Sequence, residues 1–360
     1  MSIGVSSWCW PRFVCCIVVA GLASVGRASV AGPAPQLPPT TLGRVLAPVK
    51  PTLSYQTLYS FGGRASFSDG VDPYSSLLPL NGPLYGTTDR GGANDRGTVY
   101  SIKRFGIETV VHSFGSGSDG ANPLGDLLNV DGTLYGTTSG GGYLFNCGTV
   151  YSFSTTGAET VLHSFGSGSD GLYPYAGLLN VKRTLYGTTE QGGAHGCGTV
   201  YSVSTTGAER VLHSFGCAGS GSDGTFPYAN LLNVNGRLYG TTAYGGAYNN
   251  GTVFSISTSG TQTYTVLHSF ASGSDGSEPF TGLVNVQGTL YGTTLRGGVH
   301  GGGTVYSIST TGTETVLHNF GAGADGSNPH ADLLKGKDRF FGTTSRGGTY
   351  GRGTVFTLSP

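Results

Sequence analysis

Histidine recurs at a fixed place in this sequence, and its imidazole is a common metal ligand. Five histidines share one position of an internal repeat, and Tyr59 takes the same position ahead of the first complete copy. The histidines are His112, His163, His213, His268 and His318. Ligands of one zinc ion must lie within about 2.0–2.1 Å of it, whereas equivalent positions of separate repeats stay apart. We therefore interpret the histidines as packing residues, and we expect neither a metal site nor a cofactor.

An aspartate followed by glycine also recurs in every repeat, with a proline three residues after the glycine. These aspartates are Asp69, Asp119, Asp170, Asp223, Asp275 and Asp325. Calcium-binding glycine-rich repeats need tandem nonapeptides. The aspartates lie about fifty residues apart, so we expect Asx-type turns in which the carboxylate accepts backbone N–H bonds.

The repeats differ most in a loop that carries a Gly-Gly pair, and a specific site is expected where the copies differ. Arginine precedes that pair in three copies, and aromatic and histidine residues follow in the same loops. Interfaces prefer aromatic residues and arginine. The predicted ligand-binding residues are Arg90, Gln191, Tyr244, Arg296, Arg346, His195, Tyr248, His300 and Tyr350.

Two functions fit these residues. The first is a non-catalytic recognition or structural scaffold whose ligand is a glycan or an extracellular protein. The alternative is a carbohydrate-active enzyme in which Arg90, Arg296 and Arg346 hold the carboxylate of an anionic sugar. An enzyme also needs an acid, a base or a nucleophile. The nearby candidates have no recognisable partner spacing; they are Glu190, Asp95, Asp89 and His195. We predict no catalytic residue.

The elements that position these residues follow from the repeat. Leu-Tyr-Gly-Thr-Thr begins at Leu84, Leu134, Leu185, Leu238 and Leu290, and Phe-Phe-Gly-Thr-Thr begins at Phe340. Each unit of about fifty residues contains four short segments rich in Val, Leu, Tyr, Phe and Thr, which predicts four strands, a to d. In the third unit the strands are expected at 176–181, 184–189, 199–204 and 209–215. Tight turns such as Asn235-Gly236 join strands a and b.

The ends of the repeat region predict how the units are arranged. Gln56 to Phe61 matches strand d and precedes the first complete unit, whereas the sixth unit ends after its strand c. Pairing the two would close a ring. We therefore predict an all-β fold at residues 55–360, a six-bladed β-propeller of four-stranded antiparallel blades whose last blade is closed by the N-terminal strand. An open solenoid, which would need polar caps at both ends, is the alternative fold.

Two family resemblances follow from these motifs. The Gly-Gly doublet followed by a strand that carries tyrosine resembles the kelch repeat, although the kelch tryptophan is absent. The series LYGTT, GG, GTVYS, TVLHSF and SDGxxP across residues 56–360 resembles the GloVer tandem repeat of bacterial extracellular proteins. That resemblance implies an exported protein, often attached to the cell surface, whose biochemical function is undefined.

The first residues favour export. Arg12, an apolar run over residues 13–25 and small residues at 29–31 read as a signal peptide, 1–31. Six prolines in 32–51 predict a linker, 32–54. The formal net charge is zero, with no basic cluster, which argues against a nucleic-acid partner. No later segment is apolar enough to span a membrane. We expect a secreted, extracellular monomer, with the periplasm or the cell surface as alternative locations.

An oxidising location makes paired cysteines expected. Cys147, Cys197 and Cys217 follow the proposed signal peptide. A hairpin of the third unit's strands c and d, centred between Thr206 and Gly207, places residues whose numbers sum to 413 opposite each other. Cys197 then faces Gly216, beside Cys217, so we predict a Cys197–Cys217 disulfide. Cys147 should be a free thiol or form an intermolecular bond.

Overall fold

Short antiparallel strands make up nearly all of the regular structure in the computed structural model. The model describes residues 56–359 except 116–117, 144–145, 155–156, 168, 218–222 and 260–261. The expected signal peptide and linker lie outside the described residues. In the described part of the chain, η1 (Ala65–Phe67) is a single 3₁₀ turn, and no helix is long and apolar enough to cross a membrane.

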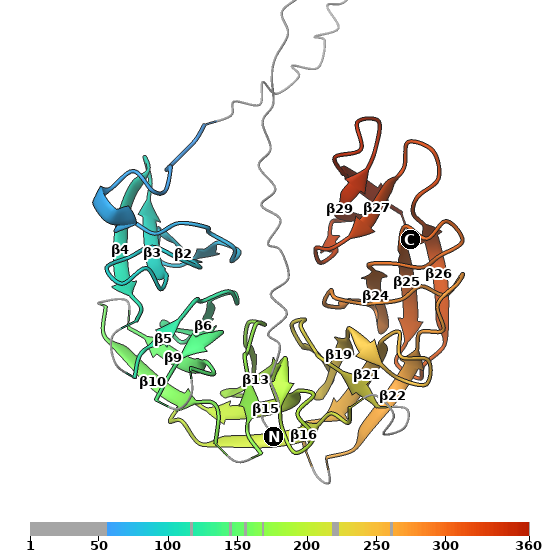
Figure 1. The fold of residues 1–360 in the computed structure, drawn as a ribbon, viewed down its shortest axis with the longest axis horizontal. Helices are drawn as coiled ribbons and strands as arrows, with labels where there is room; N and C mark the ends of the chain where they lie inside the picture. Colours follow the sequence, from blue (N-terminus) through green and yellow to red (C-terminus); the bar gives the residue numbers. More distant parts are fainter. Residues whose placement is uncertain are drawn as a thin grey trace, which may run out of the picture. The chain divides into compact units, whose positions relative to one another are not determined.

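Five successive sheets have four strands each, and their hydrogen-bonded order follows the chain, as expected for strands a to d (Figure 1). The first contains β1 (Leu78–Pro79), β2 (Leu84–Thr88), β3 (Thr98–Lys103) and β4 (Ile107–Ser113). The second contains β6 (Leu128–Val130), β7 (Thr133–Thr138), β9 (Thr149–Phe153) and β10 (Glu159–Ser164). The third contains β12 (Leu179–Val181), β13 (Thr184–Thr189), β15 (Thr199–Ser204) and β16 (Glu209–Ser214). The fourth contains β18 (Leu232–Val234), β19 (Arg237–Thr242), β21 (Thr252–Ser257) and β22 (Tyr264–Ser269). The fifth contains β23 (Val284–Val286), β24 (Thr289–Thr294), β25 (Thr304–Ser309) and β26 (Glu314–Asn319).

The sixth sheet has strands a, b and c as β28 (Leu334–Lys335), β29 (Phe340–Gly347) and β30 (Thr354–Leu358). β27 (Gly326–Pro329) pairs with the far end of β29. Three two-residue strand pairs take the place of β27 in the second, third and fourth repeats. They are β5 (Gly120–Ala121) with β8 (Gly140–Gly141), β11 (Gly171–Leu172) with β14 (Gln191–Gly192), and β17 (Gly224–Thr225) with β20 (Tyr244–Gly245).

The hydrophobic core lies between neighbouring sheets. Five clusters of buried side chains each join one sheet to the next, as Val150 and Phe165 of the second repeat pack with Leu185 and Tyr201 of the third. Val150 and Tyr151 are adjacent in β9, point to opposite faces of the strand and are both fully buried. An inner sheet is therefore covered on both faces by its neighbours, and for that reason its strands are apolar at successive positions.

Three side chains also link the strand-a regions of neighbouring sheets. Asp126 Oδ1 accepts the N–H of Ser76 at 2.6 Å. Asn230 Oδ1 accepts the N–H of Gly177, and Asp332 Oδ1 accepts that of Gly282, both at 2.7 Å. These bonds join the first sheet to the second, the third to the fourth, and the fifth to the sixth.

The predicted disulfide is present. Cys197 and Cys217 are bonded with their Cα atoms 5.4 Å apart, and Cys147 is a buried thiol. The predicted register holds at this end of the hairpin, where Thr199 faces Ser214, but it shifts by one residue nearer the turn, where Tyr201 faces Val211. A β-bulge in β16 absorbs the difference. Strand a of this repeat is also shorter than expected, because pairing begins only at Leu179.

We predict that the Cys197→Ser/Cys217→Ser variant is less stable than the wild type by roughly 3 kcal/mol, since the disulfide closes a loop with a sequence separation of 20 residues. Urea unfolding followed by circular dichroism measures the loss. Wild-type protein treated with a reductant should lose a similar amount. Equal stability of the oxidised, reduced and variant proteins would contradict the prediction.

Candidate functional site

Two sets of loops form one surface in every repeat. We call this surface the rim: it consists of the loops between strands b and c and the connections from strand d to the next strand a. The residue before each Gly-Gly pair forms a backbone pair with a residue of that connection in all six repeats. The pairs are Val71–Arg90, Ala121–Gly140, Leu172–Gln191, Thr225–Tyr244, Ser277–Arg296 and Ser327–Arg346. The backbone is thus the same at positions where the side chains differ.

The rim also connects neighbouring sheets. The residue before the repeated proline donates its N–H to a carbonyl of the preceding b–c loop, as Tyr173 does to Cys147 at 2.8 Å and Glu278 does to Asn250 at 2.8 Å. This residue has a positive φ in all six repeats, for example 60° at Tyr173 and 58° at Glu278. Left-handed backbone is unfavourable for such residues, so the inter-sheet bonds and packing must hold it in place.

The predicted ligand-binding residues all lie on the rim. His195, Tyr248, His300 and Tyr350 are exposed in the b–c loops, as are Arg90, Arg296 and Arg346, while Gln191 and Tyr244 are partly buried. Arg90 lies 3.5 Å from a carboxylate oxygen of Asp72, and Arg296 lies 3.2 Å from one of Glu278. Two of the three arginines therefore already have carboxylate partners, which a sugar carboxylate would have to displace.

A row of aromatic rings crosses the rim at positions that the sequence analysis did not select. We call it the aromatic row: Tyr175, Tyr228, Phe280 and His330, each one residue after the repeated proline in the third to sixth repeats. Successive ring centroids are 6.0, 5.2 and 5.7 Å apart. Of the predicted residues, Tyr244 joins the row, with its ring 6.1 Å from that of Phe280. The sequence does contain a signal for these positions, because the residue type after the repeated proline changes from one repeat to another.

The five histidines pair with the recurring aspartates. In the first of these pairs, His112 Nε2 lies 3.0 Å from Asp119 Oδ2, and the same carboxylate accepts the N–H groups of Gly115 and Gly120. The Asx-type turn is thus present, with a histidine added to it. His112 also packs edge-on against Phe114 and against Phe153 of the next sheet, as expected of a packing residue.

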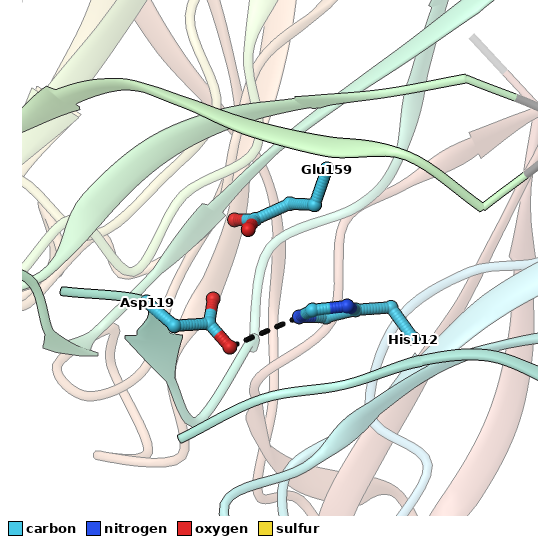
Figure 2. Close-up of side chains that lie close together, drawn as sticks. All are labelled: His112, Asp119 and Glu159. Carbon is cyan, nitrogen blue, oxygen red and sulfur yellow. Dashed lines mark hydrogen bonds and ion pairs between the residues drawn. The ribbon is translucent and has the colours of Figure 1, made fainter. Parts of the chain in front are cut away.

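A glutamate from the next sheet completes three of these junctions, a feature the sequence analysis missed. The triads are His112–Asp119–Glu159, His163–Asp170–Glu209 and His268–Asp275–Glu314, and the donor atoms of each lie within 4.8 Å of one another. Figure 2 shows the Glu159 carboxylate facing the ion pair of His112 and Asp119. These donor types could hold a metal ion, but each aspartate already accepts bonds from its histidine and from backbone N–H groups.

Burial controls the ionisation of these glutamates. One carboxylate oxygen of each has no hydrogen-bond partner among the described residues. Desolvation, reinforced by the negative charge of the neighbouring aspartate, raises the pKa of Glu159, Glu209 and Glu314 to about 7. The bond from His112 helps to lower the pKa of Asp119 against the effect of its burial. These three glutamates are therefore expected to gain or lose a proton near neutral pH.

Two further junctions have other residues at the positions of this triad. Tyr264 replaces the glutamate in the fourth sheet, and its ring stacks on His213 with centroids 3.7 Å apart. Before the first sheet, Tyr59 donates a hydrogen bond to Asp69 at 2.8 Å, and Glu108 forms an ion pair with Arg64 at 2.8 Å. The repeated junction thus accepts several residue combinations, which is typical of a packing network.

Most of the chain matches the model of one protein family. The model of the Gloeobacter/Verrucomicrobia repeat matches residues 42–195 and 146–356. The chain belongs to the Gloeobacter/Verrucomicrobia repeat family. Nothing among curated protein sequences matches this family member.

Solved structures resemble this chain at low sequence identity. A hypothetical selenium-binding protein from Sulfolobus tokodaii has 11% identity and a TM-score of 0.54, with 80% of this repeat protein and 74% of the other chain covered. A putative oxidoreductase (glucose dehydrogenase) from Thermus thermophilus has 15% identity and a TM-score of 0.45, covering 80% and 97%. A gluconolactonase from Xanthomonas campestris has 11% identity and a TM-score of 0.42, covering 81% and 99%. At these identities the likeness concerns the fold alone.

Proposed function

We propose that this chain is an exported, non-catalytic recognition scaffold, a closed six-bladed β-propeller that binds its ligand on the rim. One observation carries the proposal: six equivalent rim positions have the same backbone pairing but carry Arg90, Gly140, Gln191, Tyr244, Arg296 and Arg346. A rigid framework that presents different side chains on loops is typical of binding proteins. The disulfide between Cys197 and Cys217 supports export, since disulfides persist in oxidising compartments.

Exposed apolar residues at both ends of the series of sheets support ring closure. Val355 of β30 is 80% exposed, whereas its five equivalents are fully buried: Val99, Val150, Val200, Val253 and Val305. Leu77 before β1 is 47% exposed, although its equivalents are buried: Leu127, Leu178, Leu231, Leu283 and Leu333. Burying both surfaces against each other would remove apolar area from water.

The segment 56–61 already occupies the place of a strand d beside the first sheet. The ring of Phe61 lies 4.7 Å from that of Tyr100, just as the ring of Phe114, the residue after β4, lies 5.2 Å from that of Tyr151 in the next sheet. In a closed ring, β30 would pair with the free edge of this segment.

The register of the first sheet gives the test of closure. Thr98 faces Ser113 there, and the equivalent pair across the closure is Thr354 with Ser60. We predict that the Ser60→Cys/Thr354→Cys variant forms an intramolecular disulfide, because opposite residues of antiparallel strands come within disulfide range. Non-reducing peptide mapping detects it. The Thr98→Cys/Ser113→Cys variant is the matched control, and crosslinking of the control alone would argue against a closed ring.

Binding on the rim is tested with exposed side chains. Immobilised protein is incubated with polysaccharides and secreted proteins from the producing cells, and the bound material is compared between the wild type and the Tyr248→Ala/Tyr350→Ala variant. The control is Phe105→Ala, which removes an aromatic ring that is also exposed but lies in the turn between strands c and d. Retention that the control preserves and the rim variant loses supports the proposal. Equal retention by all three proteins, or none, would contradict it.

A further inference from the structure

The aromatic row is the most continuous apolar feature on the rim. Its four rings come from four successive repeats, and each ring contacts the next. Tyr175, Tyr228 and Phe280 are partly exposed and His330 is exposed, so part of each residue is accessible to solvent. The inner sheets bury their other aromatic residues between them, as they do Tyr201 and Phe254. The row is therefore more exposed than the core requires.

Polar groups are interleaved with the rings. The hydroxyl of Tyr228 donates to Glu190 at 2.5 Å, and Glu278 forms its ion pair with Arg296 beside Tyr244. Burial raises the pKa of the Tyr228 and Tyr244 hydroxyls, so both stay neutral hydrogen-bonding groups. The formal charges of Glu190, Glu278 and Arg296 are two negative and one positive, a net of −1. That charge disfavours an anionic ligand.

The composition of the row also discriminates between ligand classes. The buried centre of a protein–protein interface is depleted of charged residues, whereas here Glu190 and Glu278 lie among the rings. A sugar ring presents C–H groups on its faces and hydroxyls at its edges. Its faces can stack on the electron-rich faces of aromatic rings, and its hydroxyls can bond to carboxylates, tyrosine hydroxyls and guanidinium groups. A row that crosses four repeats suits an extended chain of such rings.

We propose that the aromatic row binds a neutral oligosaccharide, with Phe280 at the centre of the stacking surface. This inference rests on the proposed recognition function and names its ligand class. Glu190, Glu278 and Arg296 would direct the sugar hydroxyls. Tyr244, selected from the sequence, would mark one side of the row.

Isothermal titration calorimetry with the mature protein tests the proposal. The probes are neutral β-linked oligosaccharides of glucose, xylose and N-acetylglucosamine, together with oligogalacturonate as an anionic probe. We expect at least one neutral series to bind and the anionic probe not to bind. Phe280→Ala should weaken that binding by about tenfold, which corresponds to about 1.4 kcal/mol for one aromatic contact. Tyr228→Phe, which keeps the ring, should weaken it less. Phe105→Ala should leave it unchanged.

The outcomes separate this inference from the proposed function. Neutral-sugar binding that Phe280→Ala does not alter, in a variant with an unchanged melting temperature, would overturn the row as the site. Binding of oligogalacturonate alone would overturn the neutral ligand class. If no sugar binds but a secreted protein is retained in a rim-dependent way, the sugar proposal fails and the recognition function stands. Retention of nothing would overturn both.

Discussion

Replacing Gly148 by alanine is expected to lower the free energy of unfolding by about 4 kcal/mol. Gly148 begins the repeated Gly-Thr-Val motif and has a φ of 98°. A Cβ atom there would meet the backbone carbonyl of Thr138 and would lie 2.6 Å from Cδ of Pro174 in the connection to the next sheet. The substitution therefore combines a left-handed backbone with a clash that neither neighbour can relieve by rotating a side chain. Urea unfolding followed by circular dichroism measures the loss.

Gly132→Ala is the matched control. Gly132 lies in the turn between β6 and β7 with a φ of 87°, and a Cβ atom there would meet nothing within 4 Å. This substitution carries only the cost of the left-handed backbone, about 1–2 kcal/mol. Similar losses in the two variants would show that the contact between the sheets at Pro174 is unimportant.

Stability is expected to fall as the pH rises from about 4.5 through 7. The pKa of Glu159, Glu209 and Glu314 is raised from 4.5 to about 7 by burial. A group whose folded-state pKa is raised contributes stability that is present below the unfolded value and lost above the folded one. After allowance for partial solvent screening, each glutamate accounts for on the order of 1 kcal/mol. The measurement is the free energy of unfolding by urea at about pH 5, 6, 7 and 8.

The triple variant Glu159→Gln/Glu209→Gln/Glu314→Gln should remove most of this slope, because glutamine resembles the protonated acid and cannot ionise. It should be more stable than the wild type at the alkaline end. The control is Asp131→Asn, which removes an acid from an exposed ion pair with Arg183 and should change stability little. A wild-type slope that persists in the triple variant would show that the triads do not set the pH dependence. Below the ordinary pKa of aspartate a separate loss is expected, since the pKa of Asp119 and Asp275 is lowered in the folded state.

Strand positions and the Cys197–Cys217 bond could be predicted from the sequence because both depend on local order. The four short apolar segments within each unit and the Asn-Gly or Asp-Gly turns define hairpins, and a hairpin determines which residues face each other. The bulge between Val200 and Tyr201 could not be predicted. It shifts the register between β15 and β16 by one residue. The disulfide was still predicted correctly because the predicted centre of the turn lay half a residue away from its actual position, and this error offset the shift.

Contacts between sheets were the part that the sequence did not reveal. Glu159 and His112 lie 47 positions apart in the chain, and no periodicity of one strand places them together. The same holds for the ring contact of Tyr228 with Phe280, which depends on how closely the fourth and fifth repeats pack. The positions that vary among the six copies are visible in the sequence. Which side of a repeat contacts its neighbour is visible only in the structure.

The hydrogen bonds from backbone N–H groups to side-chain oxygens near strand a bear on how such a chain can grow during evolution. Acceptor side chains occur in the second, fourth and sixth repeats, at Asp126, Asn230 and Asp332, and their donors occur in the repeats before them. The donor is a backbone N–H group, which every repeat has, so the acceptor side chain decides where a bond forms. Duplicating a repeat without an acceptor would add a junction without this bond, whereas duplicating two adjacent repeats together keeps every bond. The acceptors thus divide the six repeats into three successive pairs, a period twice as long as that of the strands.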